Sequence, residues 1–292
     1  MTTRTSERRN LMKLGGAGLL AAGAAAGLLD ARKAAAAPAS LLQKVLSRGH
    51  LIVGTGSANA PWHFKDEKGV LTGMDIAMAK ILAKGLFDDE KKVEFVLSTP
   101  ASRIPNITTG KVDIVIDFMT VTPERAQLVA FTRPYYVEAV SLLTLAGAKI
   151  NSFEQIAAKG SGATVSILQN VGAAELVHRA LPKAKVLQLD TQANVIQALD
   201  SHRVDGAAVD LSNVRWLVKQ QPHHYADAGK TWDNMLYSAA VRLGDPDWLH
   251  FVDTAFSVAM FSDMTGHGIY VSAFQEFFGE RPPATRSGFP SI

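Results

Sequence analysis

Apolar and polar residues alternate along this chain with two different periods, and the period changes from one segment to the next. Leu51 to Thr55, Val93 to Leu97 and Val112 to Asp117 are short apolar or β-branched runs of the length expected for buried strands. Met74 to Leu86 and the stretch before Gly110 instead show helical spacing. The order strand, helix, strand, helix, strand predicts a doubly wound α/β lobe.

The same alternation returns in the second part of the chain, with elements of similar length. The expected strands and helices there are Ala163 to Ile167, Gly172 to Leu181, Val186 to Leu189, Thr191 to Leu199, Gly206 to Asp210 and Ser212 to Lys219. A strand from Leu236 to Val241 is expected to return the chain to the first lobe. The pattern therefore predicts two α/β lobes.

Capping residues mark where several of these helices begin. Ser40 is a candidate N-cap, and Gly49 stands where a short helix would end. Thr122-Pro123-Glu124 combines a hydroxyl cap, a proline at the first helical position and an acid in the first turn. Ser152 with Gln155 has the spacing of a capping box.

Candidate chemistry follows the predicted strand that ends at Asp117. Ligands of open α/β sheets bind beyond the carboxyl ends of the strands, so the segment from Asp117 to Thr122 is expected at the rim of a cleft. Arg125 stands one turn into the next helix, and its planar guanidinium suits a carboxylate. A surface ion pair explains Arg125 equally well, and spacing alone leaves both interpretations open.

Three segments, SRIPNITTGKVDIVI, MTVTPERA and FTRPYY, resemble the solute-binding proteins (family 3) of amino-acid uptake systems. These are bilobal type II periplasmic binding proteins that serve ATP-driven (ABC) importers, and the resemblance covers Leu41 to Gly279. It implies an α/β fold with two doubly wound lobes joined by a two-strand hinge near Val137 to Ser141. The first lobe would comprise residues 38–138 and 238–292, and the second lobe residues 139–237.

The resemblance also implies how a ligand is held. Arg125 would bind the α-carboxylate, and Thr120 would add a hydroxyl and a backbone N–H. Asp210 would bind the α-ammonium group, although an aspartate at the end of a strand is also a favoured helix cap. Asn170 is expected to open a helix whose positive end faces the carboxylate.

Four further residues are expected to shape the part of the site that contacts the ligand side chain. Asp117 and Phe118 stand where similar proteins often have small residues, and Asn59 and Gln169 complete the set. Asp117 would select a polar or basic side chain, or would bond its own loop. These four positions hold no cation, which argues against acidic ligands. Arg103 is the remaining residue of the expected ligand set.

The aromatic segment after the first strand has two interpretations. Trp62 and Phe64 form either a stacking platform for the ligand or a plug of the core, and an aromatic residue beside proline favours the core. His63 is expected to be exposed. His223 and His224 have no carboxylate or cysteine at metal spacing, so no metal or other cofactor is predicted.

The amino terminus has the features of an export signal. Arg8 and Arg9 precede an apolar run that reaches Leu29, and small residues follow at Ala34 to Ala37. The paired arginines resemble the twin-arginine type of signal, so residues 1–37 are expected to be removed and the protein to be periplasmic. An uncleaved anchor is the alternative, but the apolar run is shorter than the ~20 residues of a spanning helix.

Composition narrows the possible partners. The 292 residues include no cysteine, which excludes disulfides, thiolate metal sites and cysteine nucleophiles. The net charge is +3, but the expected signal holds six basic and two acidic residues. The remainder therefore has 24 basic and 25 acidic residues and a net charge of −1. This balance gives no support for nucleic-acid or anionic-membrane binding.

These observations favour a monomeric, exported, non-enzymatic binding protein. It would capture an α-amino acid by hinge closure and deliver it to the permease of an ABC transporter. One alternative is an enzyme on the same fold, similar to cyclohexadienyl or arogenate dehydratase, with Asp117 or Asp210 as the general acid. A second alternative is a ligand-sensing partner of a membrane receptor.

Overall fold

The structure is a computed structural model that describes residues 40–279 and 281–282. The expected export signal lies outside the described residues. Within the described residues, no helix is long and apolar enough to cross a membrane. Contacts within the chain group the described residues into one compact unit.

Two long strands, β8 (Tyr136–Leu145) and β12 (Tyr225–Val241), divide the chain. The first lobe contains the elements before β8 and after β12. These elements are α2 (Leu41–Arg48), β1 (Leu51–Thr55), β2 (Ala58–Asn59), β3 (His63–Lys65), β4 (Leu71–Thr72), α3 (Met74–Phe87), β5 (Val93–Leu97), α4 (Arg103–Thr108), β6 (Ile114–Thr120), α5 (Pro123–Ala126), β7 (Ala130–Phe131), α10 (Pro246–Phe261) and α11 (His267–Phe278).

The second lobe contains the elements between the two long strands β8 (Tyr136–Leu145) and β12 (Tyr225–Val241). These elements are α6 (Phe153–Ala158), the 3₁₀ helix Gly160–Gly162, β9 (Thr164–Leu168), α7 (Ala173–Ala180), β10 (Lys185–Leu189), α8 (Gln192–Asp200), β11 (Gly206–Asp210) and α9 (Leu211–Gln220).

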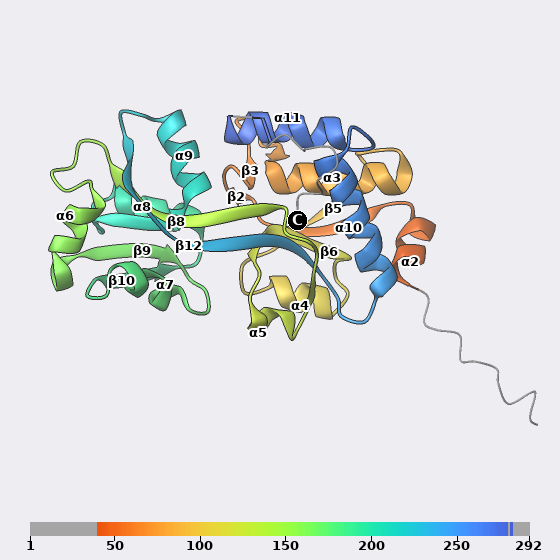
Figure 1. Cartoon of the computed structure of the whole chain (residues 1–292), viewed down its shortest axis with the longest axis horizontal. Coiled ribbons are helices and arrows are strands. Elements are labelled where there is room, and N and C mark those ends of the chain that lie inside the picture. The colour runs from red at the N-terminus through yellow and green to blue at the C-terminus, as the bar shows by residue number, and fades with distance from the viewer. Residues whose placement is uncertain (1–39, 280, 283–292) are drawn as a thin grey trace, which may run out of the picture. The chain divides into compact units, whose positions relative to one another are not determined.

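One sheet runs through both lobes, with the order β10-β9-β11-β8-β12-β6-β1-β5, and β7 also pairs with β12. The strands β2, β3 and β4 form a separate small sheet. Pairing is parallel among β5, β1 and β6 and among β10, β9 and β11. The long strands β8 and β12 are antiparallel to each other and to their outer neighbours β11 and β6. Figure 1 shows these two strands running between the helices of the two lobes.

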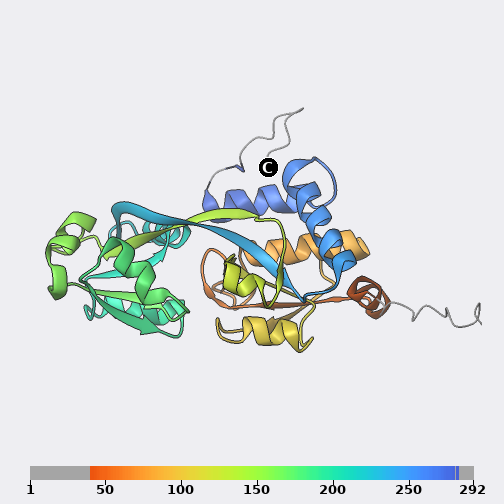
Figure 2. The ribbon, with the colours of Figure 1, turned by 60° about the horizontal axis from the view of Figure 1, so that its bottom comes forward.

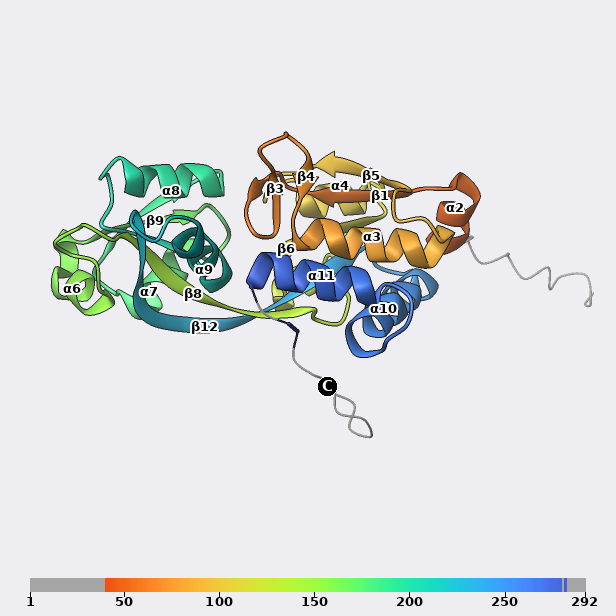
Figure 3. The same ribbon diagram turned by 90° about the horizontal axis from the view of Figure 1, so that it is seen from above.

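Helices cover both faces of the sheet in each lobe, as a doubly wound fold requires. In the first lobe α3, α10 and α11 lie together on one face (Figure 3), whereas α4 covers the other face (Figure 2). In the second lobe, α6 and α7 pack on one face, and α8 and α9 pack on the opposite face. The predicted fold class is therefore confirmed.

The predicted caps are present where the sequence indicated them. The side chain of Ser40 accepts a hydrogen bond from the N–H of Leu42 at the start of α2, and Thr122 caps α5 in the same way. Ser152 and Gln155 form the expected capping box at α6.

Two strands differ from their predicted bounds because tertiary pairing extends them. The strand expected to end at Asp117 continues to Thr120, since its last residues pair with β12. The strand expected from Leu236 begins at Tyr225 instead. Its first part has exposed polar residues and shifts in its pairing with β8, so the alternation of apolar and polar residues is not visible in the sequence. The expected lobe boundaries, at residues 138/139 and 237/238, fall inside the long strands β8 and β12 and remain predictions.

Candidate functional site

Asp117 lies inside β6 and has no exposed surface, so the expectation that it ends its strand and faces a cleft is wrong. Arg103 of α4 donates two hydrogen bonds to it, from Nε to Oδ2 at 2.7 Å and from Nη2 to Oδ1 at 3.1 Å. Arg103 itself is 4% exposed. A buried carboxylate needs such a charged partner, and the bidentate geometry fixes both side chains.

His63 extends this buried cluster, so the expectation that it would be exposed is wrong. Its Nδ1 lies 2.8 Å from Oδ2 of Asp75, and its Nε2 lies 3.3 Å from Oδ1 of Asp117. Tyr135 donates its hydroxyl to the other oxygen of Asp75. Burial lowers the pKa of His63 to about 4 and raises the pKa of Asp75 to about 7. The imidazole is therefore neutral at neutral pH.

His63, Asp75 and Asp117 are close enough together to hold a metal ion, since one ligand atom of each lies within 4.8 Å of the others. The guanidinium of Arg103 already occupies both oxygens of Asp117. A metal ion would have to displace this guanidinium and to tolerate its charge. We therefore assign this buried cluster a structural role and not that of a metal centre.

Phe118 connects the buried cluster to the other aromatic residues of the site. Its ring lies 4.5 Å below the guanidinium carbon of Arg103 and 6.0 Å from the ring of Tyr237. Its backbone has a φ of 35°, in the left-handed region that favours glycine. The N–H of Phe118 donates to Asp75, which holds this conformation in place.

Arg125 bridges the two lobes. Its Nη1 donates to the backbone oxygen of Thr120 at 2.8 Å, and its Nη2 donates to Oδ1 of Asn170 in the second lobe at 3.0 Å. The side chain is partly buried, and burial and then the neighbouring charge of Arg103 lower its pKa. The surface ion pair considered from the sequence is therefore not the contact that the structure gives to Arg125.

Asp210 ends β11 and occupies the N-cap position of α9, but its side chain makes no capping hydrogen bond. Instead, Tyr237 of β12 donates its hydroxyl to Oδ2 of Asp210. Burial raises the pKa of Asp210 to about 6, and the hydroxyl of Tyr237 and the charge of Arg103 act in the opposite direction.

A chain of hydrogen bonds joins Trp62 of the first lobe and Ser212 of the second lobe to Glu138 of β8. Trp62 donates its indole N–H to the hydroxyl of Ser212 at 2.9 Å, and Ser212 donates to Glu138 at 2.5 Å. Burial and then the charge of Asp210 raise the pKa of Glu138 to about 8. Trp62 is fully buried among Tyr136, Tyr237 and Phe278, so the core interpretation of this tryptophan is correct.

The other residues expected to bind the ligand differ in burial and in their contacts. Asn170 does not open a helix, because α7 begins at Ala173 after Gly172, and the side chain of Asn170 instead accepts from Arg125. Gln169 is exposed. Asn59 is buried and accepts a hydrogen bond from Asn213 of α9 at 2.6 Å.

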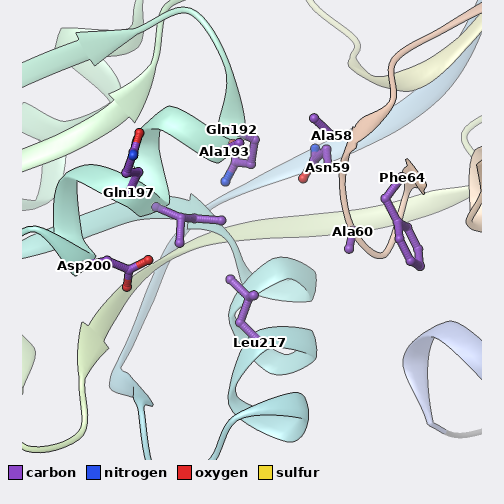
Figure 4. A pocket seen from close by; sticks show the side chains of 10 residues that line it. Ala58, Asn59, Ala60, Phe64, Gln192, Ala193, Gln197, Asp200 and Leu217 are labelled. Carbon is purple, nitrogen blue, oxygen red and sulfur yellow. The ribbon is translucent and has the colours of Figure 1, made fainter. Parts of the chain in front are cut away.

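A pocket of about 310 Å³ lies between the β2–β3 hairpin of the first lobe and helices α8 and α9 of the second lobe (Figure 4). Most of its wall is apolar. The lining residues are Ala58, Asn59, Ala60, Phe64, Gln192, Ala193, Ile196, Gln197, Asp200 and Leu217. Of the expected ligand residues, it includes Asn59.

Sequence reasoning missed several residues that hold the expected ligand groups in place. Tyr237 was within a predicted strand, and only the pairing of β12 with β8, which in turn pairs with β11, brings its hydroxyl to Asp210. Glu138 and Ser212 were also missed, because the bond between them joins positions 74 residues apart. One signal could have identified Glu138, namely an acidic residue within the apolar segment expected to form the hinge.

The two-lobed architecture and the pocket between the lobes indicate the class of protein. The chain belongs to the bacterial extracellular solute-binding proteins, family 3, whose family model matches residues 51–277. It is similar to the glutamine-binding protein of Geobacillus stearothermophilus, with 33% identity over 63% of this chain and 69% of the relative. The glutamine-binding protein of a Bacillus subtilis ABC transporter is 28% identical over 73% of this chain and 75% of its own length.

Solved structures give the same class. The cysteine-binding protein of Campylobacter jejuni matches with a TM-score of 0.70 and 28% identity, over 82% of this chain and 93% of that chain. An ancestral amino acid-binding protein, described as a precursor of cyclohexadienyl dehydratase, matches with a TM-score of 0.70 and 32% identity. This match covers 82% of this chain and all of the ancestral chain.

Proposed function

We propose that this protein binds an α-amino acid between its two lobes and delivers it to an ABC transporter in the inner membrane. The observation that carries the proposal is the position of two opposite charges. Arg125 belongs to the first lobe and donates to Asn170 of the second lobe. Asp210 belongs to the second lobe and accepts the hydroxyl of Tyr237. A zwitterion offers a carboxylate to the first group and an ammonium to the second.

The magnitudes are consistent with this proposal. Each charge-assisted hydrogen bond contributes ~1.5 to 3 kcal/mol net. Three such bonds, from Arg125, Thr120 and Asp210, give ~5 to 9 kcal/mol. A micromolar dissociation constant requires ~8 kcal/mol, so these contacts alone approach the affinity that uptake requires. Neither lobe holds both ends of the ligand, which explains why ligand would favour closure about β8 and β12.

Names of similar proteins support an amino acid as the ligand. Curated relatives include proteins named for glutamine and for L-cystine, and one matched structure is described as an ancestral arginine-binding protein bound to glutamine. The expected signal in residues 1–37, outside the described part of the chain, supports export by the twin-arginine route to the periplasm. The permease partner and the monomeric state are part of the same proposal.

The test is calorimetric titration of the mature protein with the common amino acids. We expect at least one ligand, and we expect Arg125→Ala to abolish its binding. Arg133→Ala is the matched control, because Arg133 is an exposed arginine of the same lobe. Unchanged affinity in Arg125→Ala, or an equal loss in Arg133→Ala, would contradict the assignment of the carboxylate site.

A dehydratase is the second candidate, because one structural neighbour is described as a precursor of cyclohexadienyl dehydratase. The raised pKa of Asp210, about 6, is also suited to a general acid. Incubation with prephenate or arogenate separates the two candidates. Formation of the aromatic product, lost in Asp210→Asn, would favour the enzyme over the binding protein.

A further inference from the structure

The helix α9 begins directly after Asp210, and its first N–H groups need acceptors. Asp210 has the backbone of an ordinary N-cap residue, with φ −61° and ψ 141°. An aspartate in this position usually accepts a hydrogen bond from the N–H of the second or third helical residue. The side chain of Asp210 makes no such bond. The first turn of α9 thus lacks the acceptor that its own cap residue would ordinarily supply.

Glu138 of β8 supplies an acceptor in its place. Its Oε1 accepts a hydrogen bond from the N–H of Ser212, the second residue of α9, at 3.3 Å, and another from the N–H of Ala139 at 2.9 Å. Its Oε2 lies 2.5 Å from the hydroxyl oxygen of Ser212. Glu138 and Ser212 are both 2% exposed, so water does not compete for these bonds. A glutamate of the neighbouring strand therefore does the work of the missing cap.

The pairing of β11 with β8 explains why Glu138 reaches the helix. Asp210 pairs with Val140 in an antiparallel register. Two residues further along this register, Ser212 comes opposite Glu138, and alternate residues of a strand lie on the same face of the sheet. Trp62, which is fully buried, donates its indole N–H to the hydroxyl of Ser212. The contact between Glu138 and Ser212 is thus set by backbone pairing and held by a second buried partner.

The bond from Glu138 leaves the carboxylate of Asp210 out of the helix cap. Oδ2 of Asp210 accepts from the hydroxyl of Tyr237, and within the described residues no other side chain or backbone N–H bonds this carboxylate. If Asp210 capped α9 itself, it would use acceptor capacity on its own helix. A ligand ammonium group would then have to break that bond before it could bind.

We propose that Glu138 is a positioning residue of the amino-acid site, because it caps α9 from the neighbouring strand and so keeps the carboxylate of Asp210 free for the ammonium group of the ligand. The inference rests on the proposed function for the role of the ligand. The capping part concerns the ligand-free protein and can be tested there by itself.

The protonation of Glu138 decides which variants separate capping from charge. Burial and then the charge of Asp210 raise the pKa of Glu138 to about 8, so Glu138 is neutral in the pH range near 6 where Asp210 titrates. Its proton then lies on Oε2, beside the hydroxyl of Ser212, and Oε1 still accepts both N–H groups. Glutamine offers the same arrangement, with a carbonyl oxygen and an NH₂ group. Glu138→Gln therefore keeps the cap, whereas Glu138→Met keeps the length of the side chain and removes the acceptor.

The first measurement is made without ligand, on the mature protein labelled with ¹³C at the aspartate carboxyl carbons. The NMR signal of Asp210 is identified by its loss in Asp210→Asn, and its titration gives the pKa. We expect the pKa of Asp210 to stay near 6 in Glu138→Gln. In Glu138→Met, Asp210 takes over the N–H of Ser212, and its pKa should fall by about one to two pH units. Tyr237 and the charge of Arg103 act on Asp210 in every variant alike.

The second measurement is calorimetric titration at pH 7, with L-glutamine first and then the other common amino acids. Glu138→Met should weaken binding about tenfold, since the ligand must displace one charge-assisted bond, and Glu138→Gln should restore the affinity of the wild-type protein. Glu175→Met is the matched control, because Glu175 is an exposed acid in the first turn of α7 in the same lobe. It should change neither the affinity nor the pKa of Asp210.

A second variant guards against the case in which Glu138→Met does not fold. Glu138→Asp keeps a carboxyl group but is one methylene shorter, so it should lose the bond to the N–H of Ser212 and behave as Glu138→Met does. Circular dichroism confirms the fold of each variant before it is used.

Three results would overturn the role of Glu138. The first is a pKa of Asp210 that does not move in Glu138→Met or in Glu138→Asp. The second is Glu138→Gln behaving as Glu138→Met does, which would assign the effect to charge. The third is unchanged affinity in both acceptor-deficient variants. A wild-type protein that binds no amino acid would contradict the proposed function instead, and the pKa of Asp210 in the ligand-free variants would still decide whether Glu138 caps α9.

Discussion

Asp117 and Asp210 are comparable in sequence, since each was expected at the carboxyl end of a parallel strand, but their surroundings differ. Asp117 is fully buried and bound at both oxygens by Arg103, and the neutral ring of His63 closes the cluster. Asp210 is only partly buried, and a single tyrosine hydroxyl bonds its side chain. Asp117 is already paired within the protein, whereas Asp210 retains acceptor capacity for a ligand.

The difference arises from the length of the strands. Pairing with β12 carries β6 past Asp117 to Thr120, so Asp117 enters the core where α4 supplies Arg103. β11 stops at Asp210, and α9 begins immediately afterward. The carboxylate inside the sheet is thereby paired with a buried arginine, whereas the carboxylate at the end of a strand has one tyrosine hydroxyl as its side-chain partner.

The largest expected effect is on stability, and it tests whether Asp117 is structural. Asp117→Ala leaves the buried guanidinium of Arg103 without its partner, which should lower the free energy of unfolding by ~3 to 5 kcal/mol. Asp210→Ala removes one hydrogen bond and should cost ~1 kcal/mol. Urea titration followed by circular dichroism measures both. Similar losses for the two variants would remove the distinction drawn between the two acids.

A smaller effect is expected on the pH dependence of ligand affinity. The ammonium group of the ligand needs the ionised form of Asp210, whose pKa is raised to about 6. Affinity should therefore be constant above this pKa and fall below it, by about tenfold for each further pH unit. Calorimetry at several pH values on both sides of 6 measures this. Asp210→Asn should bind weakly with no such step, and a step that persists in this variant would assign the titration to another group.

The smallest effect concerns the hydroxyl of Tyr237. This hydroxyl stabilises the ionised form of Asp210, so Tyr237→Phe should raise the pKa of Asp210 and move the pH step upward. The free energy of unfolding should change by only ~1 kcal/mol. Tyr135→Phe is the matched control, because it removes the hydroxyl that bonds Asp75 instead. A pH step that moves equally in both variants would contradict the role of Tyr237.

Local patterns were sufficient for most of the fold. The strands Leu51–Thr55, Val93–Leu97 and Gly206–Asp210 have the bounds expected from their apolar runs. The capping box at Ser152 was also correct. These features depend on residues within a few positions of one another, so the sequence carries them directly.

The set of site residues predicted from the sequence was less complete than the predicted fold, because the side chains that contact these residues are distant in the chain. Arg103 is 14 residues from Asp117, and Ser212 is 150 residues from Trp62. His63 was expected in solvent because no nearby residue indicated that two buried carboxylates would flank it.

The sequence by itself determined the alternation of strands and helices, the helix caps and the presence of Arg125 and Asp210 at the starts of helices that follow strands. Only the tertiary structure decided which carboxylate is paired with a buried arginine and which bonds a single tyrosine hydroxyl. The physical reason is that a local pattern fixes the direction and period of the backbone. The charge state and burial of a side chain depend instead on groups that folding brings together from distant parts of the chain.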